Sequence, residues 1–224
     1  IARPETGKTA FWVSLVASTK GFAWQKKKVS IFANEEPAIR TQMRLLNACT
    51  GLQRGSILNG SRDLTKKVWG EINPYIENFD CVGKTMEDLN EYCANNDVDI
   101  LIIDQLDKIN VTGKFNATHE KLREVYTQAR ELAKRHNILV IGMSQASAEA
   151  QGRSRVTFSA MENSKTGKAA EADLILGLGK EDEEENFMSD CTRFVTLSKN
   201  KLTGDHAEFE VVLVPTTSRF AERR

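Results

Sequence analysis

The stretch that decides the fold is Ala2-Arg3-Pro4-Glu5-Thr6-Gly7-Lys8-Thr9, which reads ARPETGKT in the one-letter code. It fits the pattern of a phosphate-binding loop, except that Ala2 stands where the first glycine usually is. A mostly apolar helix is expected directly after it, over residues 11–18. This helix disfavours the alternative, a chance Gly-Lys-Thr in an ordinary loop. The stretch therefore predicts a nucleotide site at the start of a helix.

Each part of this loop has a chemical task in nucleotide binding. Backbone N–H groups of the loop and of the helix N-terminus point at the β- and γ-phosphates. The Lys8 side chain neutralises phosphate charge, and the Thr9 hydroxyl ligates magnesium. The predicted cofactors are ATP, or another nucleoside triphosphate, and Mg²⁺. The residues predicted to bind them here are Ala2, Arg3, Pro4, Glu5, Thr6, Gly7, Lys8, Thr9 and Ala10.

Outward from the loop, short apolar strands alternate with helices. Helices are expected over 37–49, 86–94 and 119–136, and a surface helix followed by a loop over 57–78. Strands are expected over 29–33, 79–82, 98–103, 138–143 and 174–178, and a hairpin over 193–198 and 208–214. This order predicts a three-layer α/β domain with a largely parallel central sheet and a C-terminal β-hairpin.

Composition bounds the possible classes of protein. The 224 residues, 40% hydrophobic and 28% charged, suit one globular domain, 1–224, that buries a central sheet. The net charge is zero, so any nucleic-acid surface must be local. The four cysteines are widely spaced, which favours a reducing, cytosolic setting, and no apolar run approaches the ~20 residues that span a membrane.

Because a buried strand normally precedes such a loop, we expect the chain to be a fragment that lacks this strand and any upstream domain.

Two carboxylates follow predicted parallel strands and are candidates for the same site. Asp104 ends the apolar run 98–103, so it reaches the crevice where open α/β sheets bind ligands and can hold magnesium. An acid in that position is often only structural, but the phosphate loop makes it the expected second half of the site. Glu35 follows the strand 29–33, and its carboxylate can orient the water that attacks the γ-phosphate. The alternative for Glu35 is helix capping, because it lies just before Pro37.

An amide and two lysines are further candidates. Gln145 follows the strand 138–143 and can bond both the γ-phosphate and the loop after it, although it can also be a polar strand end with no special partner. Lys199 and Lys201 lie on one face of a hairpin strand end, which is usually a solvated edge. In a ring of subunits they can instead reach the neighbour's γ-phosphate. We expect Lys8, Thr9, Glu35, Asp104 and Gln145 to converge around one triphosphate.

Together these stretches resemble the RecA-like motor domain of DnaB-type replicative helicases, a group that includes phage primase-helicases and the mitochondrial helicase Twinkle. The resemblance covers nearly the whole chain. The segments that carry it are ARPETGKT, IFANEEP over 31–37, Ile102-Ile103-Asp104, Gly142-Met143-Ser144-Gln145, residues 161–176 and Thr217-Ser218-Arg219-Phe220. In the family pattern, Glu35 is the catalytic glutamate, Asp104 binds magnesium and Gln145 senses phosphate. Two positions depart from that pattern: Lys201 replaces the usual trans-acting arginine, and Asn163 stands where an arginine is common.

The resemblance implies a RecA-like fold, a homo-hexameric ring, ATP hydrolysis, movement along single-stranded DNA and strand separation. It also implies primase or polymerase as possible partners, and the cytoplasm of a bacterial cell or phage-infected host as the location. In this family, loops after the magnesium-binding strand and the glutamine strand line the pore. The basic residues of those loops here are Lys114, Arg153, Arg155, Lys165 and Lys168.

Three alternatives to this reading stay open. Any one of the five basic residues is equally readable as an ordinary surface charge. The rival functions are a recombinase or clock-type ring that does not unwind DNA, and a nucleotide-dependent switch or assembly module.

Overall fold

In the computed structural model of the chain, residues 1–161, 165–181 and 191–223 are described, except for the side chains of Lys165 and Thr166. A parallel four-stranded sheet has the order β2-β1-β3-β4. Its strands are β1 (Val29–Ala33), β2 (Ile76–Asp80), β3 (Ile100–Asp104) and β4 (Leu139–Gly142). The central strands β1 and β3 are buried along their whole length, as expected for parallel strands covered on both faces.

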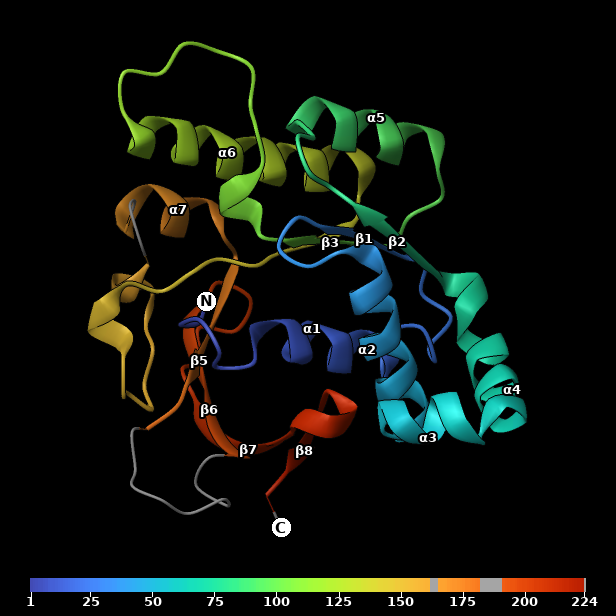
Figure 1. The fold of residues 1–224 in the computed structure, drawn as a ribbon. Helices are drawn as coiled ribbons and strands as arrows, with labels where there is room; N and C mark the ends of the chain where they lie inside the picture. Colours follow the sequence, from blue (N-terminus) through green and yellow to red (C-terminus); the bar gives the residue numbers. More distant parts are fainter. Residues whose placement is uncertain (162–164, 182–190, 224) are drawn as a thin grey trace.

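Helices cover both faces of this sheet (Figure 1). The helices α5 (Met86–Asn95) and α6 (Thr118–His136) lie on one face, and α1 (Lys8–Ala17) and α2 (Ala38–Thr50) on the other. Alternate residues of β3 point to the two sides, because side chains of a strand alternate. Leu101 and Ile103 belong to the core under α5 and α6, whereas Ile100 and Ile102 belong to the core with α1 and α2. The predicted three-layer α/β fold is therefore confirmed.

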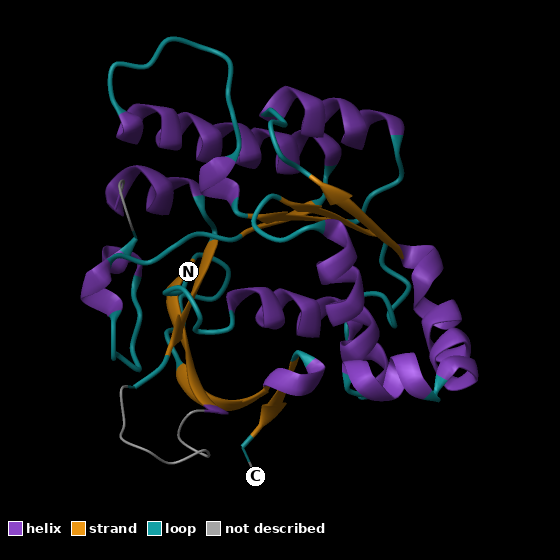
Figure 2. Ribbon diagram, in the orientation of Figure 1, coloured by secondary structure: helices purple, strands orange, loops and turns teal. Residues whose placement is uncertain are grey.

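A second, antiparallel sheet has the order β5-β6-β7-β8 (Figure 2). Its strands are β5 (Leu174–Gly179), β6 (Thr192–Asn200), β7 (Glu208–Val214) and β8 (Arg219–Glu222). The predicted C-terminal hairpin is the β6–β7 pair. Ala2 makes parallel bridges to both Gln145 and Leu178, so the start of the chain lies between the end of β4 and β5. The phosphate loop therefore sits where the two sheets meet.

The segment over 57–82 differs from the expectation. Two short helices, α3 (Arg54–Asn59) and α4 (Arg62–Ile72), occupy the place of one helix and a loop, and β2 begins at Ile76 instead of residue 79. β2 is an edge strand whose only buried residue is Ile76, so its hydrophobic pattern is weak. The remaining elements are α7 (Lys165–Glu171) and the 3-10 turns η1 (Asn73–Tyr75), η2 (Leu106–Lys108), η3 (Ala148–Ala150), η4 (Phe158–Ala160) and η5 (Pro215–Thr217). Among the described helices, none has both the length and the apolar character that crossing a membrane requires.

β5 packs so closely against the segment before η4 that it needs glycine. A Cβ atom on Gly177 would lie 1.7 Å from the Val156 carbonyl oxygen. We expect Gly177→Ala to lower the free energy of unfolding by about 1–3 kcal/mol, because the added methyl group has to displace backbone. Gly70→Ala is the control: it lies in α4 with no atom within 4 Å of its Cβ position, and it should raise stability by about 0.5–1 kcal/mol. Urea denaturation measures both, and equal stability of Gly177→Ala and the wild type would contradict the close packing.

Candidate nucleotide-binding site

The phosphate loop has a fixed backbone shape. Gly7 caps the N-terminus of α1 with a φ of 106°, a left-handed conformation that favours glycine. A Cβ atom there would also lie 2.9 Å from Leu213 Cδ2. The buried Arg193 of β6 donates a 2.7 Å hydrogen bond from Nε to the Thr6 carbonyl. The antiparallel sheet thus holds the loop through Arg193. The helix α1 begins at Lys8, so its first N–H groups face the loop.

Four of the predicted residues meet at the end of this loop. Lys8 Nζ lies 3.1 Å from Glu35 Oε2 and 3.8 Å from Asp104 Oδ1. The Thr9 hydroxyl donates a 3.0 Å hydrogen bond to Asp104 Oδ2. These side chains come from α1, from the segment after β1 and from the end of β3, so they converge because the ends of parallel strands share one edge of the sheet.

Asp104 is a buried carboxylate with an incomplete set of donors. It is 2% exposed, and the Trp12 indole donates a 2.7 Å hydrogen bond to Oδ2. Burial raises the pKa of Asp104, while the charge of Lys8 and the hydrogen bonds from Trp12 and Thr9 oppose that rise. Among the described residues, none donates a hydrogen bond to Oδ1. A carboxylate that keeps one oxygen without a hydrogen-bond donor, and whose other oxygen contacts the Thr9 hydroxyl, suits Mg²⁺, which prefers oxygen ligands and waters.

Glu35 is held in place by Gln105, which the sequence pattern did not reveal, and Gln105 is held by Asn34. Gln105 Nε2 donates a 2.8 Å hydrogen bond to Glu35 Oε2. The Asn34 side chain in turn accepts from the Gln105 backbone N–H at 2.6 Å and donates to its carbonyl at 3.0 Å. Burial raises the pKa of Glu35, but the hydrogen bond and charge of Lys8 and the hydrogen bond of Gln105 outweigh it, and the pKa is lowered. The carboxylate therefore stays ionised and able to accept a hydrogen bond from water.

Gln145 is joined to the loop through its backbone. The Ala2 N–H donates to the Ser144 carbonyl at 3.3 Å, and the Ala146 N–H donates to the Ala2 carbonyl at 2.9 Å. Arg3 Nη1 adds a 3.0 Å hydrogen bond to the Ala146 carbonyl. The structure thus places half-buried Gln145 beside the first residues of the phosphate loop.

The two candidate finger lysines contact α7 within their own chain. Lys199 Nζ donates to the carbonyls of Ala169 and Ala170, and Lys201 Nζ donates to the Ala170 carbonyl at 3.3 Å. Lys201 Nζ also lies 3.5 Å from Asp173 Oδ1. Burial and the adjacent charge of Lys201 lower the pKa of Lys199. Both ammonium groups therefore cap the carbonyl end of α7, where the helix dipole favours cations.

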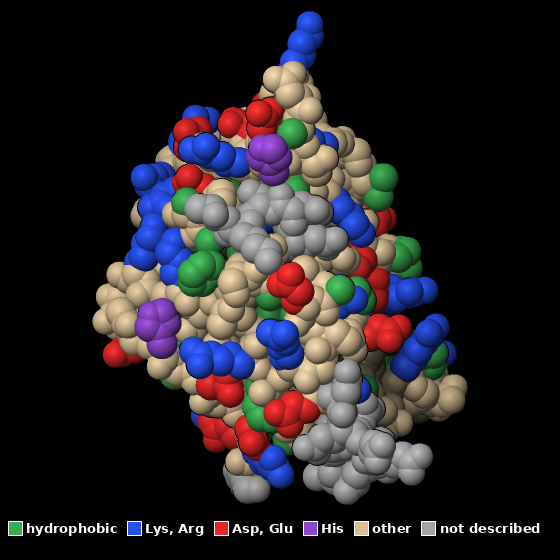
Figure 3. All heavy atoms as spheres, turned by 90° about the vertical axis from the view of Figure 1, so that its left-hand side faces the viewer, with side chains coloured by type: hydrophobic (Ala, Val, Ile, Leu, Met, Phe, Trp, Pro, Cys, Tyr) green, Lys and Arg blue, Asp and Glu red, His purple; other side chains and the backbone are tan. Residues whose placement is uncertain are grey.

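The five basic residues proposed to contact DNA have different surroundings. Lys114, Arg153 and Arg155 are exposed, and the Lys165 side chain lies outside the described residues, as does the whole of Asn163. Lys168 is 1% exposed, and its Nζ lies 2.8 Å from Asp107 Oδ1. The Lys168 ammonium is therefore not available to a DNA backbone in this arrangement. On the face drawn in Figure 3, acidic side chains lie among the basic ones.

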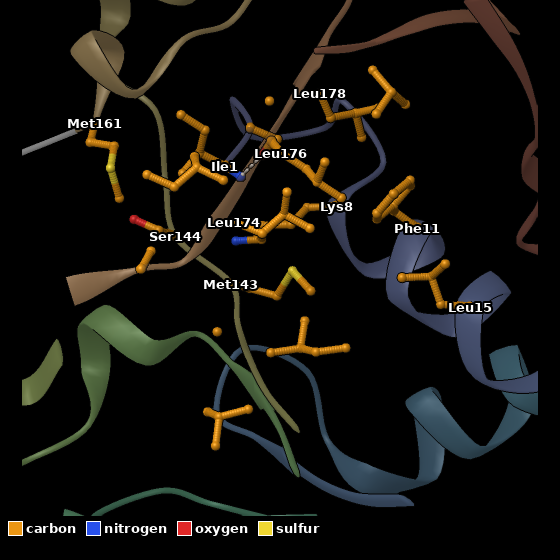
Figure 4. A pocket seen from close by; sticks show the side chains of 18 of the residues that line it. Ile1, Lys8, Phe11, Leu15, Met143, Ser144, Met161, Leu174, Leu176 and Leu178 are labelled. Carbon is orange, nitrogen blue, oxygen red and sulfur yellow. Dashed lines mark hydrogen bonds between the residues drawn. The ribbon is translucent and has the colours of Figure 1, made fainter. Parts of the chain in front are cut away.

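A cavity of about 340 Å³ lies beside the loop, between β4 and β5 (Figure 4). Its wall is mainly aliphatic and includes Leu139, Ile141, Leu174 and Leu176. Apolar walls offer no partners for phosphate oxygens, because buried polar groups require hydrogen bonds. The triphosphate therefore fits the polar cluster around Lys8 and Asp104 better than this cavity.

Sequence reasoning missed Trp12, Gln105 and Arg193 as parts of the site. Trp12 lies three residues after Thr9 on a helix, so a shared face was a readable signal. Gln105 directly follows Asp104, but nothing local shows that it turns toward Glu35. Arg193 is 187 positions from Thr6, and no local pattern connects them.

The indole hydrogen bond to Asp104 makes a testable contribution to stability. We expect Trp12→Phe to lower the free energy of unfolding by about 1.5–3 kcal/mol, because it removes a buried donor to a charged group. The control is Trp24→Phe, since Trp24 Nε1 donates a 3.0 Å hydrogen bond to a neutral carbonyl, that of Ala17. That change should cost about 0.5–1.5 kcal/mol. Urea denaturation compares the two, and a smaller loss for Trp12→Phe than for Trp24→Phe would refute the assigned contact.

Comparisons with known proteins identify the family and the fold of the chain. The family model of the DnaB-like helicase C-terminal domain matches residues 1–222. A solved ATPase domain and a structure titled as a DnaB-like replicative helicase and its interactions with primase both match all of this chain, each with a TM-score of 0.80 and 20% identity. The chain covers 83% of the first and 56% of the second, and at this identity both show the fold.

The comparison with curated protein sequences found no match. The family model, however, spans nearly the whole chain, and the phosphate loop and the two carboxylates lie together as a nucleotide site requires. This chain belongs to the DnaB-like helicase C-terminal domain family, whose members are the ATP-hydrolysing motor domains of helicases.

Proposed function

We propose that this chain hydrolyses ATP between subunits of a hexameric ring, and that hydrolysis moves single-stranded DNA through the ring and separates duplex strands. The observation that carries the proposal is the meeting of Lys8, Thr9, Glu35 and Asp104 at the end of the phosphate loop. The match of the family model over residues 1–222 supports the helicase reading over other uses of such a site.

Each residue of the cluster has a task in this proposal. Lys8 and the N–H groups at the start of α1 bind the β- and γ-phosphates, and Ala2 to Ala10 supply the surrounding loop. Thr9 and Asp104 hold Mg²⁺, which neutralises phosphate charge when it is bound. Lys8 leaves the Glu35 carboxylate for the phosphates, so Glu35 is then free to accept a hydrogen bond from the attacking water. Gln145 donates a hydrogen bond to the γ-phosphate and also bonds the loop that follows it, so the loop responds to the bound nucleotide.

The proposed ring would let two subunits contribute catalytic groups to one site. Lys199 and Lys201 cap α7 of their own chain. In the proposal they reach instead the γ-phosphate bound by the adjacent subunit, where a cation stabilises the charge of the transition state. Lys201 provides that charge without the two-pronged geometry of arginine.

Single-stranded DNA is held by loops that face the centre of the ring. Lys114, Arg153 and Arg155 are exposed candidates. Lys165, whose side chain lies outside the described residues, is a further candidate. Cations of this kind bind the phosphate backbone with little sequence preference. One similar solved structure describes a DnaB-like replicative helicase and its interactions with primase, which supports primase as a further partner. A polymerase is a second proposed partner, from the family resemblance alone. A replicative motor of this type works in the cytoplasm of a bacterium or of a phage-infected host.

The role of Glu35 can be tested with one substitution. We expect Glu35→Gln to reduce ATP turnover by at least ~100-fold, because the amide no longer accepts a proton or orients water as the carboxylate does. Nucleotide binding should remain, since Lys8 and Thr9 are unchanged. Glu36→Gln is the matched control: Glu36 pairs with Arg44 at 2.8 and 2.9 Å and should leave turnover within about twofold. Phosphate release and equilibrium nucleotide binding are the measurements, and normal turnover in Glu35→Gln would remove Glu35 from its assigned role.

A forked DNA duplex separates the proposed motor from its rivals. We expect ATP-dependent strand displacement by the chain, with ATPase stimulation by single-stranded DNA, because translocation couples the two. The displaced strand is measured by fluorescence, and Glu35→Gln serves as the inactive control. Stimulation without displacement would favour a recombinase or clock-type ring. No response to DNA would favour a nucleotide-dependent switch or assembly module.

A further inference from the structure

Asp107 lies at the centre of a network of hydrogen bonds that the proposed mechanism does not use. Its Oδ1 accepts a 2.8 Å hydrogen bond from the Tyr126 hydroxyl and lies 2.8 Å from Lys168 Nζ. Its Oδ2 accepts from the Ser144 hydroxyl at 2.8 Å and from the Gln145 N–H at 3.4 Å. Each oxygen of an ionised carboxylate has about two acceptor sites, so four donors saturate Asp107.

The donors of this network come from elements that lie far apart along the chain. Tyr126 belongs to α6, Lys168 to α7, and Ser144 and Gln145 follow β4. Burial, together with the negative charge of Asp107, raises the pKa of Tyr126, so its hydroxyl stays protonated and remains a donor. Lys168 Nζ also lies 5.5 Å from the centre of the Tyr126 ring, within range of a cation–π contact. Asp107 is therefore fixed by α6 and α7 together.

A buried ion pair at this place is weak evidence for added stability. Lys168 is 1% exposed, so its charge is removed from water, and a well-packed apolar pair commonly stabilises as much as a buried ion pair does. Buried charges can instead fix one arrangement of the surrounding elements. Here the fixed element is the segment after β4: Asp107 accepts from the Ser144 side-chain hydroxyl and from the Gln145 backbone N–H.

The opposite side of the same backbone is bound to the phosphate loop. Ala2 donates to the Ser144 carbonyl and accepts from the Ala146 N–H. The peptide units around Gln145 therefore lie between the loop and Asp107, with hydrogen bonds to both. A shift in the position of Asp107 would therefore also move the backbone from which the Gln145 side chain extends.

We propose that Asp107, held by Lys168 and Tyr126, is a positioning residue that sets the Gln145 side chain against the γ-phosphate. This inference rests on the proposed role of Gln145 as the phosphate sensor. It assigns to Lys168, which cannot reach DNA from its buried position, a task in nucleotide discrimination through Asp107. A structural role alone predicts lost stability, whereas a positioning role predicts lost preference for ATP over ADP.

The experiment compares the affinities of the chain for a slowly hydrolysed ATP analogue and for ADP. The main variant is Asp107→Ala combined with Lys168→Met, which removes both charges and leaves no unpaired buried ion. Ser144→Ala is a milder variant that removes one hydrogen bond to Asp107, and it decides the question if the double variant does not fold. Gln145→Ala is the reference for complete loss of sensing. The control is Asp97→Asn combined with Lys28→Met, because this ion pair is solvent-exposed.

We expect the double variant and Gln145→Ala to lose the preference for the ATP analogue by similar factors, roughly tenfold, as for one hydrogen bond to a charged group. Ser144→Ala should lose less, and the control should equal the wild type. A folded double variant, or Ser144→Ala in its place, that keeps the wild-type preference while Gln145→Ala loses it would overturn the positioning role and leave the proposed function intact. Wild-type preference in Gln145→Ala itself would overturn the sensor role and, with it, this inference.

Discussion

The parallel pairing of β1 with β3 is the constraint on which the nucleotide site depends. Its register puts Ala33 opposite Asp104, so the chain that leaves β1 passes directly beside the end of β3. Glu35 lies two residues beyond Ala33, and the Asn34 N–H donates a 2.7 Å hydrogen bond to the Asp104 carbonyl. A slip of one residue would turn every side chain of β1 to the opposite face and separate the two carboxylates. Lys8 can contact both only because this register brings them together.

Much of the fold was readable from the sequence because its central elements have strong periodic patterns. The strand over 29–33 and the helix over 119–136 agree with β1 and α6 to within one residue. A fully buried strand is a continuous apolar run, and a helix with one buried face repeats every three to four residues. β2 gave no such signal, because an edge strand with one buried residue resembles a loop. The two-helix segment before it is mainly exposed, and its polar sequence hid where one helix ends and the next begins.

The candidate site was predictable where its residues follow strands or a loop motif, and unpredictable where they depend on packing. Lys8, Thr9, Glu35 and Asp104 all lie at such positions, and the structure brings them together. Burial, in contrast, is a property of the assembled layers. Lys168 was expected to be a pore-loop cation because the family resemblance places the loops after the glutamine strand in the pore, yet α7 turns it toward Asp107. The contacts of Lys199 and Lys201 were also not predictable from the sequence. They require the end of β6 and the end of α7 to be neighbours, which depends on packing.

The clamped shape of the phosphate loop has a consequence for how a ligand associates. Gly7 sets its turn, the Arg193 guanidinium fixes the Thr6 carbonyl, and Arg3 ties its beginning to Ala146. A loop that is already ordered loses little conformational entropy when a ligand arrives, so the binding sites for phosphate oxygens are preorganised. Association should then proceed without a slow ordering step, and differences in affinity between nucleotides should arise from the groups that contact their phosphates rather than from rearrangement of the loop.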